Sequence, residues 1–397
     1  MSSVAQARAA MLDAIAPLGA EGVELSQALG RTLAAPVIAG RDQPPFHASA
    51  MDGYALCAAD TPGGLDIVGE AAAGRGYARA LKSGEAVRIS TGAPLPQGAD
   101  CVLAQEDARV TGDKLDTGAI APGRHVRPLG GDFSQGEILL PQGRLLDAVA
   151  LALAASTGAE KLLVMKQPRV SILCGGNEII PPGASPRADQ IFDSCSYGVE
   201  ALAKSWGAMV TRQTPLGDDI AAIEPAAAAA LKHSDLVVFI GAASVGPHDH
   251  ARAAFEKLGA ELRVRKIDMR PGKPTWFART PGAPVLGLPG NPASALVCAA
   301  LFLHPILAKL QGREAGNAFK RALLAQALPA NGAREAYLRA RVESDEAGQI
   351  RIDAGADQDS SRLTVFAGAN ALLHRPPGAP AASVGDIVAY LAWPNAD

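Results

Sequence analysis

Residues 283–307 read APVLGLPGNPASALVCAALFLHPIL and contain a complete strand, turn and helix. The run APVLGLP is short and apolar, which is typical of a buried strand, and the longer run ASALVCAALFLHPIL is typical of a buried helix. Asn291 can cap this helix, and Pro292 fits its first position. Gly287 and Gly290 permit close backbone approach at the turn. The stretch therefore predicts one βα step of an α/β domain.

The same alternation extends from Arg169 to about Leu310. Strand-like runs RVSILC, DLVVFIG and ELRVRKI alternate with helix-like runs SYGVEALAKSWG and HARAAFEKLG. Such units need right-handed crossovers and a mainly parallel sheet, so the loops at the carboxyl ends of the strands form the expected ligand crevice. In IAAIEPAAAAALKH, Pro225 weakens the helix prediction and leaves a helix start at Pro225 itself as the alternative.

Three helices are expected outside this region. An amphipathic helix should open the chain behind the caps Ser2 and Ser3, because Val4, Met11, Leu12 and Ile15 fall on one helical face. A second short helix should run from Ser26 toward Gly30. The stretch LLDAVALALAASTG predicts a buried helix that begins at Asp147 and is closed by Gly158.

Two further regions have the pattern of β-domains. From about Met51 to Leu140, and again after Asn317, short apolar runs are separated by turn sequences. The chain thus predicts an α/β plus β multidomain fold with a central α/β domain and a mainly parallel sheet. Its expected parts are an extended helical segment (1–46 and 141–167), an inserted small β-domain (47–140), the α/β domain (168–315) and a C-terminal β-barrel (316–397).

The composition indicates a globular protein with a small ligand. A chain of 397 residues is too long for one ordinary core. The net charge of −3 gives no general attraction to nucleic acid or an anionic membrane, so local loops must hold any anionic ligand. Because no signal peptide or membrane-length apolar run is evident, we expect a cytoplasmic protein. The five cysteines lack metal-ligand spacing and are expected to be free thiols.

Three turns of the α/β region, LCGGNE, IGAASVG and LPGNPAS, are built from small residues. Each exposes backbone amides at a helix N-terminus, which suits a phosphate or another oxyanion, although any one such turn is ordinary α/β packing. In RPGKP (270–274), two prolines stiffen the segment that carries Arg270 and Lys273. This segment predicts a phosphate clamp, with a rigid solvent-facing turn as the alternative.

Acidic residues recur at turns, where carboxylates can bind hydrated Mg²⁺ beside substrate phosphates. For Asp218 and Asp219, a helix cap or a turn is an equal alternative. His248 and His250 flank Asp249, but an HxH pair without a third ligand does not predict a transition-metal site. The sequence lacks GxSxG, GxxxxGK[ST] and a GxGxxG that opens a helix, so phosphate chemistry with Mg²⁺ remains. The acidic candidates are Asp52, Asp132, Glu178, Asp218, Asp219 and Asp249.

Six motifs, read together, resemble those of molybdopterin molybdenumtransferases and the homologous gephyrin domain. Their order and spacing also match, and they extend over nearly the whole chain. The resemblance implies an extended helical piece with an inserted β-domain, an α/β molybdopterin-binding domain and a C-terminal β-barrel. The motifs are SAMDGYA (49–55), RISTGAP (88–94), GNEI (176–179), SVGPHD (244–249), PGKP (271–274) and GLPGNPASA (287–295).

The same resemblance implies a reaction and its partners. Members of the family take adenylylated molybdopterin and molybdate, use Mg²⁺, and release AMP as molybdenum is bound by the dithiolene sulfurs. A homodimer is implied, in which the β-domain of one subunit covers the α/β pocket of the other. Transient contact with the upstream adenylyltransferase and with molybdoenzyme maturation proteins is also implied, and neither nucleic acid nor membrane is.

Site roles follow from the motifs by resemblance. Asp52, Thr91, Asp132, Glu178 and Asp249 are implied as catalytic, and Glu178, Asp218 and Asp249 as the residues that handle Mg²⁺ or molybdate. Lys266 is a weaker anion-binding candidate. The implied substrate-binding residues are Gly176, Asn177, Ser244, Gly246, Arg270, Lys273, Pro289, Gly290, Asn291 and Pro292.

Several positions depart from the family pattern. Gly175–Glu178 reads GGNE where Thr-Gly-Asp-Glu is usual, Ala242 replaces a glycine, and Cys195 replaces an asparagine. Arg270 stands where lysine is common. Two alternatives therefore accompany the molybdenum-inserting enzyme: a non-catalytic molybdopterin-binding carrier or scaffold, and a molybdopterin adenylyltransferase. Retention of Asp52, Glu178, Asp249 and Lys273 favours the enzyme over the carrier, and the two extra β-domains argue against the adenylyltransferase.

Overall fold

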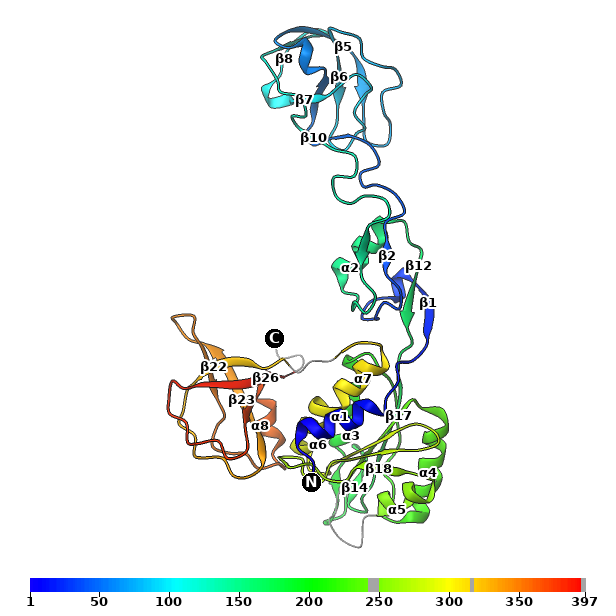
Figure 1. The fold of residues 1–397 in the computed structure, drawn as a ribbon, viewed down its shortest axis with the longest axis vertical. Helices are drawn as coiled ribbons and strands as arrows, with labels where there is room; N and C mark the ends of the chain where they lie inside the picture. The colour runs from blue at the N-terminus through cyan, green and yellow to red at the C-terminus, as the bar shows by residue number, and fades with distance from the viewer. Residues whose placement is uncertain (242–249, 315–317, 394–397) are drawn as a thin grey trace. The chain divides into compact units, whose positions relative to one another are not determined.

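The computed structural model of the chain describes residues 1–241, 250–314 and 318–393 (Figure 1). The chain forms two compact units. The large unit comprises Met1–Gly22, Gly30–Ala34 and Leu163–Asp397, and the small unit comprises Val23–Leu29 and Ala35–Leu162. Ser244, Gly246 and Asp249, three of the predicted site residues, lie outside the described residues.

A six-stranded sheet forms the centre of the large unit, in the order β16-β13-β17-β21-β20-β18. The first four strands are parallel, as predicted. Since β20 is antiparallel to both of its neighbours, β18 runs in the same direction as β21. The carboxyl ends of five strands therefore share one edge. The strands are β13 (Arg169–Cys174), β16 (Met209–Arg212), β17 (Leu236–Ile240), β18 (Glu261–Val264), β20 (Trp276–Arg279) and β21 (Val285–Leu288).

Helices cover both faces of this sheet, which explains why its central strands are apolar at every position. Along β17, Val238 and Ile240 belong to one buried cluster, whereas Val237 and Phe239 belong to another. The first cluster includes residues of α1 (Val4–Asp13), α3 (Cys195–Ser205) and α6 (Pro292–Cys298). The second includes residues of α4 (Ile220–His233) and α5 (His250–Lys257). The predicted βαβ alternation is confirmed.

The opening helix is also confirmed, together with its cap. The side chain of Ser3 accepts a hydrogen bond from the backbone N–H of Gln6, and Gln6 returns one to Ser3, which forms a capping box. The prediction of a helix start at Pro225 is wrong. Helix α4 begins at Ile220, where the Asp219 carboxylate caps it by accepting the N–H of Ala222. Pro225 stays inside the helix because Ile223, Ala227 and Ala230 on one face are buried.

The run ASALVCAALFLHPIL folds into a segmented helix. α6 leads into a π-helical segment (Ala299–Leu303) and then α7 (His304–Leu310), with Pro305 near the start of α7. The π segment lies where Pro305 removes a helical N–H donor. Contrary to the sequence expectation, Pro292–Leu310 is long and apolar enough to span a membrane by length and composition. However, 78% of its 18-residue apolar window is buried inside the protein, as in a core helix.

The C-terminal part of the large unit is a closed five-stranded barrel, as predicted. The strands follow the order β23-β24-β22-β26-β25, and β25 pairs back to β23 to close the barrel. The short strand β19 (Met269–Arg270) adds to β23 from outside. Sequence patterns missed β19, β25 and the helix α8 (Leu363–Ala367). The barrel strands are β22 (Lys320–Leu324), β23 (Glu335–Ser344), β24 (Ile350–Asp353), β25 (Ala371–Arg375) and β26 (Ile387–Ala392).

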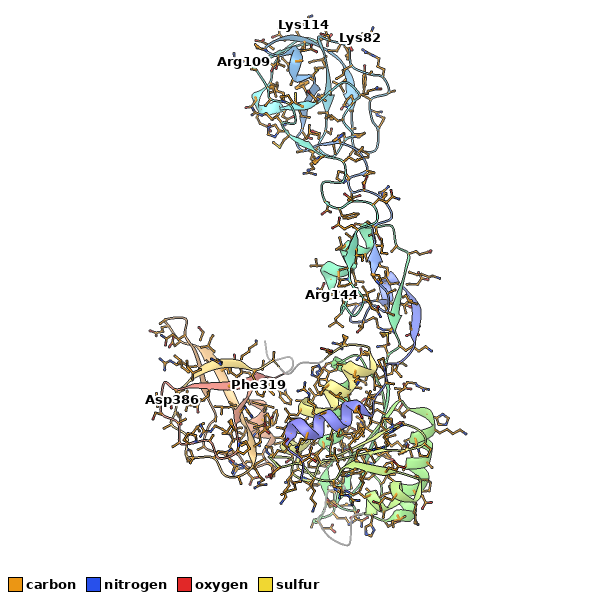
Figure 2. All side chains as sticks on the ribbon, in the orientation of Figure 1. Lys82, Arg109, Lys114, Arg144, Phe319 and Asp386 are labelled. Carbon is orange, nitrogen blue, oxygen red and sulfur yellow. The ribbon has the colours of Figure 1, made fainter. Side chains whose placement is uncertain are left out.

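The small unit contains the predicted β-domain as a sheet of order β7-β4-β6-β5-β9-β8. Its charged surface includes Lys82, Arg109 and Lys114 at one end (Figure 2), where Lys114 pairs with Asp66. The strands are β4 (Gly53–Leu56), β5 (Gly63–Ala71), β6 (Glu85–Ile89), β7 (Cys101–Ala104), β8 (Arg109–Thr111) and β9 (Lys114–Thr117).

Short elements complete the small unit. The pairs β2–β11 (Val37–Ile38 with Ile138–Leu140) and β3–β10 (Ala48–Ser49 with Val126–Arg127) flank its sheet in sequence. Helix α2 (Ala148–Ser156) begins behind Asp147 and is followed by Gly158 at φ +84°, as predicted, but only its Ala150 and Ala154 are buried. The helix predicted from Ser26 is instead a 3₁₀ turn, Leu25–Gln27, since four residues before Gly30 are too few for an α-helix.

Candidate functional site

Three glycines meet where β13, β17 and β21 end. A Cβ on Gly241 would lie 2.3 Å from the carbonyl oxygen of Gly175, and one on Gly290 would lie 3.3 Å from the Cα of Gly241. Gly241 also has φ +100°, which favours glycine. The backbones of three strand ends are therefore in contact, with no side chain between them. This leaves the carboxyl edge of the sheet lined by peptide groups, as an oxyanion site needs.

Two acidic loops lie side by side at this edge. The backbone N–H of Asp218 donates to Asn177 Oδ1 at 3.1 Å, and the N–H of Gly176 donates to the carbonyl of Leu216. Because β13 and β16 are parallel neighbours, the loops that follow them start at the same edge. The structure thus brings together Asn177, Glu178 and Asp218, and both carboxylates are exposed.

The start of α3 adds groups to this edge that sequence reasoning did not select. Asp193 is 3% exposed, and its carboxylate accepts hydrogen bonds from the backbone N–H and the hydroxyl of Ser196. Cys195 donates its S–H to the carbonyl of Gly290 at 3.2 Å. The DSCS sequence before a helix-like run was the available signal, since Asp and Ser at such a position indicate a helix start.

Burial makes the cysteines here poor nucleophiles. It raises the pKa of the Cys195 thiol to about 11 and raises the pKa of Cys174 further above its ordinary value. Thiolate is the reactive form, so both side chains remain thiols at neutral pH. All five cysteines are free, as predicted. Cys195 therefore contributes a hydrogen bond between α3 and the turn before α6.

The polar groups at the turn before α6 have other hydrogen-bond partners than predicted. Asn291 stands at the cap position, but its side chain does not cap the helix and instead donates to Ser360 Oγ at 2.9 Å. The N–H of Ala293 donates to the carbonyl of Ser360. A loop of the C-terminal barrel thus satisfies an N–H of the first turn that was expected to face a ligand. Pro292 holds the first helical position, as predicted. Gly287 lies within β21 rather than in the turn, and a Cβ there would lie 2.0 Å from the Trp276 side chain.

The loop between β18 and β20 carries Lys266, Arg270 and Lys273. Since β18 runs in the same direction as β21, this loop leaves the sheet at the edge that carries Gly175, Gly241 and Gly290. Strand spacing of about 4.8 Å places it roughly 19 Å from the loop after β13, four strands away. Within the described chain, neither Arg270 nor Lys273 forms an ion pair. Both cations are therefore available to a ligand.

In the small unit, two predicted residues are in contact. The backbone N–H of Thr91 donates to Asp52 Oδ1 at 2.6 Å. Antiparallel pairing of β4 with β6 sets Gly53 opposite Ile89, so the residue before β4 and the residues after β6 meet at one end. The hydrogen bonds from Thr91, chiefly that of its backbone N–H, lower the pKa of Asp52. Asp132 is exposed, and its N–H bonds to the carbonyl of Gln43, without a contact to Asp52 or Thr91.

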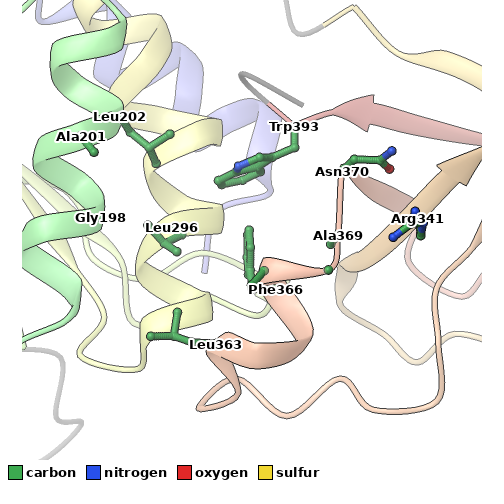
Figure 3. Close-up of a pocket in the computed structure, with 12 residues that line it drawn as sticks. Gly198, Ala201, Leu202, Leu296, Arg341, Leu363, Phe366, Ala369, Asn370 and Trp393 are labelled. Carbon is green, nitrogen blue, oxygen red and sulfur yellow. The ribbon is translucent and has the colours of Figure 1, made fainter. Parts of the chain in front are cut away.

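A cavity of about 740 Å³ lies elsewhere in the large unit, between α3, α6 and α8 (Figure 3). Leu202, Leu296, Phe366 and Trp393 line it, with Arg341 and Asn370 at one side. None of the predicted site residues contributes to this apolar cavity. An oxyanion requires N–H donors or cations, which the carboxyl edge of the sheet supplies better.

The donors at this edge suit a hard, hydrated cation. Among residues 1–241, 250–314 and 318–393, no three His, Cys, Asp or Glu side chains are close enough to hold a metal ion. A fully protein-coordinated metal is therefore not formed by these residues. Two carboxylates and an amide are enough for Mg²⁺, which keeps several of its waters and completes its shell with substrate oxygens.

The sheet with its glycine-lined edge and the appended barrel define a ligand-binding α/β protein of several domains. Comparison with protein families specifies the class. Residues 2–158 match the MoeA N-terminal region (domain I and II), residues 171–309 match a probable molybdopterin binding domain, and residues 321–393 match the MoeA C-terminal region (domain IV). The chain belongs to the molybdopterin molybdenumtransferase family.

Individual relatives agree with this assignment over nearly their whole length. The molybdopterin molybdenumtransferase of Nostoc sp. is 34% identical, over 94% of this chain and 89% of its own. That of Haemophilus influenzae is 33% identical, over 94% of each chain. The crystal structure of the molybdopterin biosynthesis MoeA protein from Pyrococcus horikosii superposes with a TM-score of 0.84 at 30% identity and covers 99% of both chains.

Proposed function

We propose that this protein completes the molybdenum cofactor by inserting molybdate into adenylylated molybdopterin, with release of AMP. The relatives of similar length carry the name of this activity. The observation that carries the proposal is the junction of the loops after β13 and β16, where Asp218 bonds to Asn177 beside Glu178. Exposed carboxylates next to a peptide-lined edge are what an oxyanion substrate with a metal ion requires.

Each group has a role that follows from its chemistry. Glu178 and Asp218 would hold Mg²⁺ by their carboxylate oxygens, with Asp249 as a third ligand that lies outside the described residues. When bound, Mg²⁺ supplies positive charge to the phosphoanhydride that is cleaved. Arg270 and Lys273 bind substrate anions, and Gly176 and Gly290 allow the substrate to approach the backbone.

The width of the edge suits a long ligand. Adenylylated molybdopterin has a pterin dithiolene at one end and a nucleotide at the other, joined through phosphates. The carboxylate loops and the cationic loop lie at opposite sides of the same edge, several strands apart. One ligand can therefore contact both, with its phosphates over Gly241 and Gly290.

We further propose a cytoplasmic homodimer in which Asp52 and Thr91 of one subunit, with Asp132, serve the α/β pocket of the other. An active site shared in this way requires an isologous dimer with two equivalent pockets. Contacts with the upstream adenylyltransferase and with proteins that mature molybdoenzymes would then be transient.

The proposed activity is tested by measuring turnover of the purified protein. Purified protein is incubated with adenylylated molybdopterin, Mg²⁺ and molybdate, and AMP release is followed together with cofactor formation. The proposal expects AMP release that depends on both molybdate and Mg²⁺. Tight binding of the pterin nucleotide without molybdate-dependent AMP release would contradict it and identify a carrier instead.

A further inference from the structure

The cationic loop, residues 265–275, is held internally by few bonds. The N–H of Ile267 donates to the carbonyl of Lys273 at 3.0 Å across the loop, and the N–H of Thr275 donates to Gly272. Gly272 has φ +112°, and a Cβ there would lie 2.3 Å from Cys298 Sγ. The tip of the loop is thus packed onto α6 at a position where only glycine fits.

Other parts of the large unit hold the middle of the loop. Ser2 lies along it as a parallel bridge partner: its N–H donates to Lys266, and its carbonyl accepts from Asp268. On the other side, β19 pairs with β23, and the N–H of Glu335 donates to the carbonyl of Asp268. These contacts fix the backbone from Lys266 to Asp268.

One side chain contacts both ends. Nη2 of Arg252, in the first turn of α5, donates to the carbonyl of Arg265 at 3.2 Å and to the carbonyl of Pro274 at 3.5 Å. Its Cζ lies 5.7 Å from the centroid of the Trp276 ring. Arg265 opens the loop, Pro274 directly follows Lys273, and Trp276 begins β20. The guanidinium of Arg252 therefore joins the two ends of the loop next to the pairing of Val264 with Phe277 between β18 and β20.

We propose that Arg252 is a positioning residue that sets where Arg270 and Lys273 point, and so controls the affinity for the substrate phosphates. This inference rests on the proposed function, in which those two cations bind the pterin nucleotide. The planar guanidinium can lie over Trp276 while its N–H groups reach two carbonyls. The ammonium of a lysine is a compact charge without that fork, so Arg252→Lys keeps the charge but loses the bridge.

The structural part of the test is amide hydrogen exchange at Ile267, which reports the bond across the loop without any ligand. Arg252→Gln should speed this exchange about ten-fold, and Arg252→Lys should do so to a similar degree, with little change at β17. Arg263→Gln is the matched control, because Arg263 on β18 is exposed and, among the described residues, forms an ion pair with Glu261 alone. Unchanged Ile267 exchange in both Arg252 variants would overturn the proposal. If Arg252→Gln has a much lower melting temperature, the exchange rate of Ile267 in Arg252→Lys alone tests the proposal.

The functional part measures the binding of adenylylated molybdopterin by calorimetry at low salt. Lys273→Ala and Arg252→Gln should each weaken binding about five- to ten-fold. The double variant should lose less than the product of the two single losses, because only Arg270 is left for Arg252 to position. Fully additive losses would mean that Arg252 acts independently of Lys273, which contradicts a positioning role. Unchanged binding by Lys273→Ala would instead refute the proposed role of the loop cations, while Ile267 exchange still decides whether Arg252 closes the loop.

Discussion

Asp52 in the small unit is an exposed carboxylate held in a different way from Glu178 and Asp218 in the large unit. In the small unit, Asp52 already accepts the backbone N–H of Thr91 at 2.6 Å, and this bond lowers its pKa. For Glu178 and Asp218 in the large unit, the hydrogen bonds are made by the backbone. The carbonyl of Glu178 accepts from Ile191, and the N–H of Asp218 donates to Asn177. Within the part of the chain that the structure describes, neither of these two carboxylates accepts a hydrogen bond or forms an ion pair.

This difference separates two kinds of acidic residue. A carboxylate that accepts a backbone N–H is kept charged and in one place, so it suits a fixed contact to a substrate group. Carboxylates with free lone pairs on a fixed backbone can instead take up a cation without breaking bonds. This difference agrees with the proposed roles, in which the large unit holds the metal and Asp52 orients a substrate group.

The largest loss of stability is expected where the backbones of Gly175, Gly241 and Gly290 are in contact. Gly241→Ala places a Cβ 2.3 Å from a backbone carbonyl at φ +100°, so strain and overlap add. We expect a loss of about 3 kcal/mol or more in the free energy of unfolding, measured by urea denaturation. Gly183→Ala is the control, since Gly183 has φ +89° but open space around it, and it should cost only about 1 kcal/mol. Equal losses would show that the contact with Gly175 does not matter.

The neighbouring aspartates Asp218 and Asp219 should give opposite results. Asp218→Ala should lower molybdate-dependent AMP release about 100-fold and change stability by less than about 0.5 kcal/mol, because an exposed metal ligand supports no core contact. Asp219→Ala should cost about 1 kcal/mol of stability, through the lost cap of α4, and leave turnover nearly normal. The two variants are compared by thermal melts and by AMP release at saturating Mg²⁺. A normal rate in Asp218→Ala would remove Asp218 from the metal site.

The smallest effect concerns the pKa of Asp52. Since that pKa is lowered in the folded protein, the stabilisation is present above the ordinary value of 3.8 and is lost as the pH falls through the folded pKa. Thr91→Ala removes the side-chain contribution but keeps the larger backbone one, so the pKa should stay below 3.8, whereas Thr91→Pro removes both and should bring the pKa back toward 3.8. Carboxyl carbon NMR between pH 5 and pH 2.5 measures both. Equal titration of the two variants would contradict the role of the backbone bond.

General rules of α/β folds made the large unit predictable from sequence. Parallel strands bring the turns after them to one edge, so GGNE and LPGNPAS could be placed together without coordinates. What the pattern could not give is which N–H groups are free at that edge. Ser360, 69 residues after Asn291, accepts hydrogen bonds from the Asn291 side chain and from the N–H of Ala293 in the first turn of α6. A local sequence pattern cannot predict a contact over that distance in the chain.

In the small unit, the contact between Asp52 and Thr91 depends on strand register, which the sequence pattern left open. A shift of one residue in the β4–β6 pairing would separate the two groups. The helix start proposed at Pro225 was wrong because tertiary packing decides there. Burial of Ile223, Ala227 and Ala230 outweighs the lost N–H. Strand β19 was missed since two residues carry no period at all.

The central claim is that the two carboxylate sites serve one reaction, with Asp52 supplied by the partner subunit. Asp52→Asn and Glu178→Gln, each inactive alone, are mixed in equal amounts under conditions that exchange subunits, and molybdate-dependent AMP release is measured. Half of the dimers become mixed, and one pocket in each mixed dimer combines intact Glu178 with an intact Asp52, so activity should return to roughly a quarter of the unmodified protein. No recovery despite verified subunit exchange would contradict the claim.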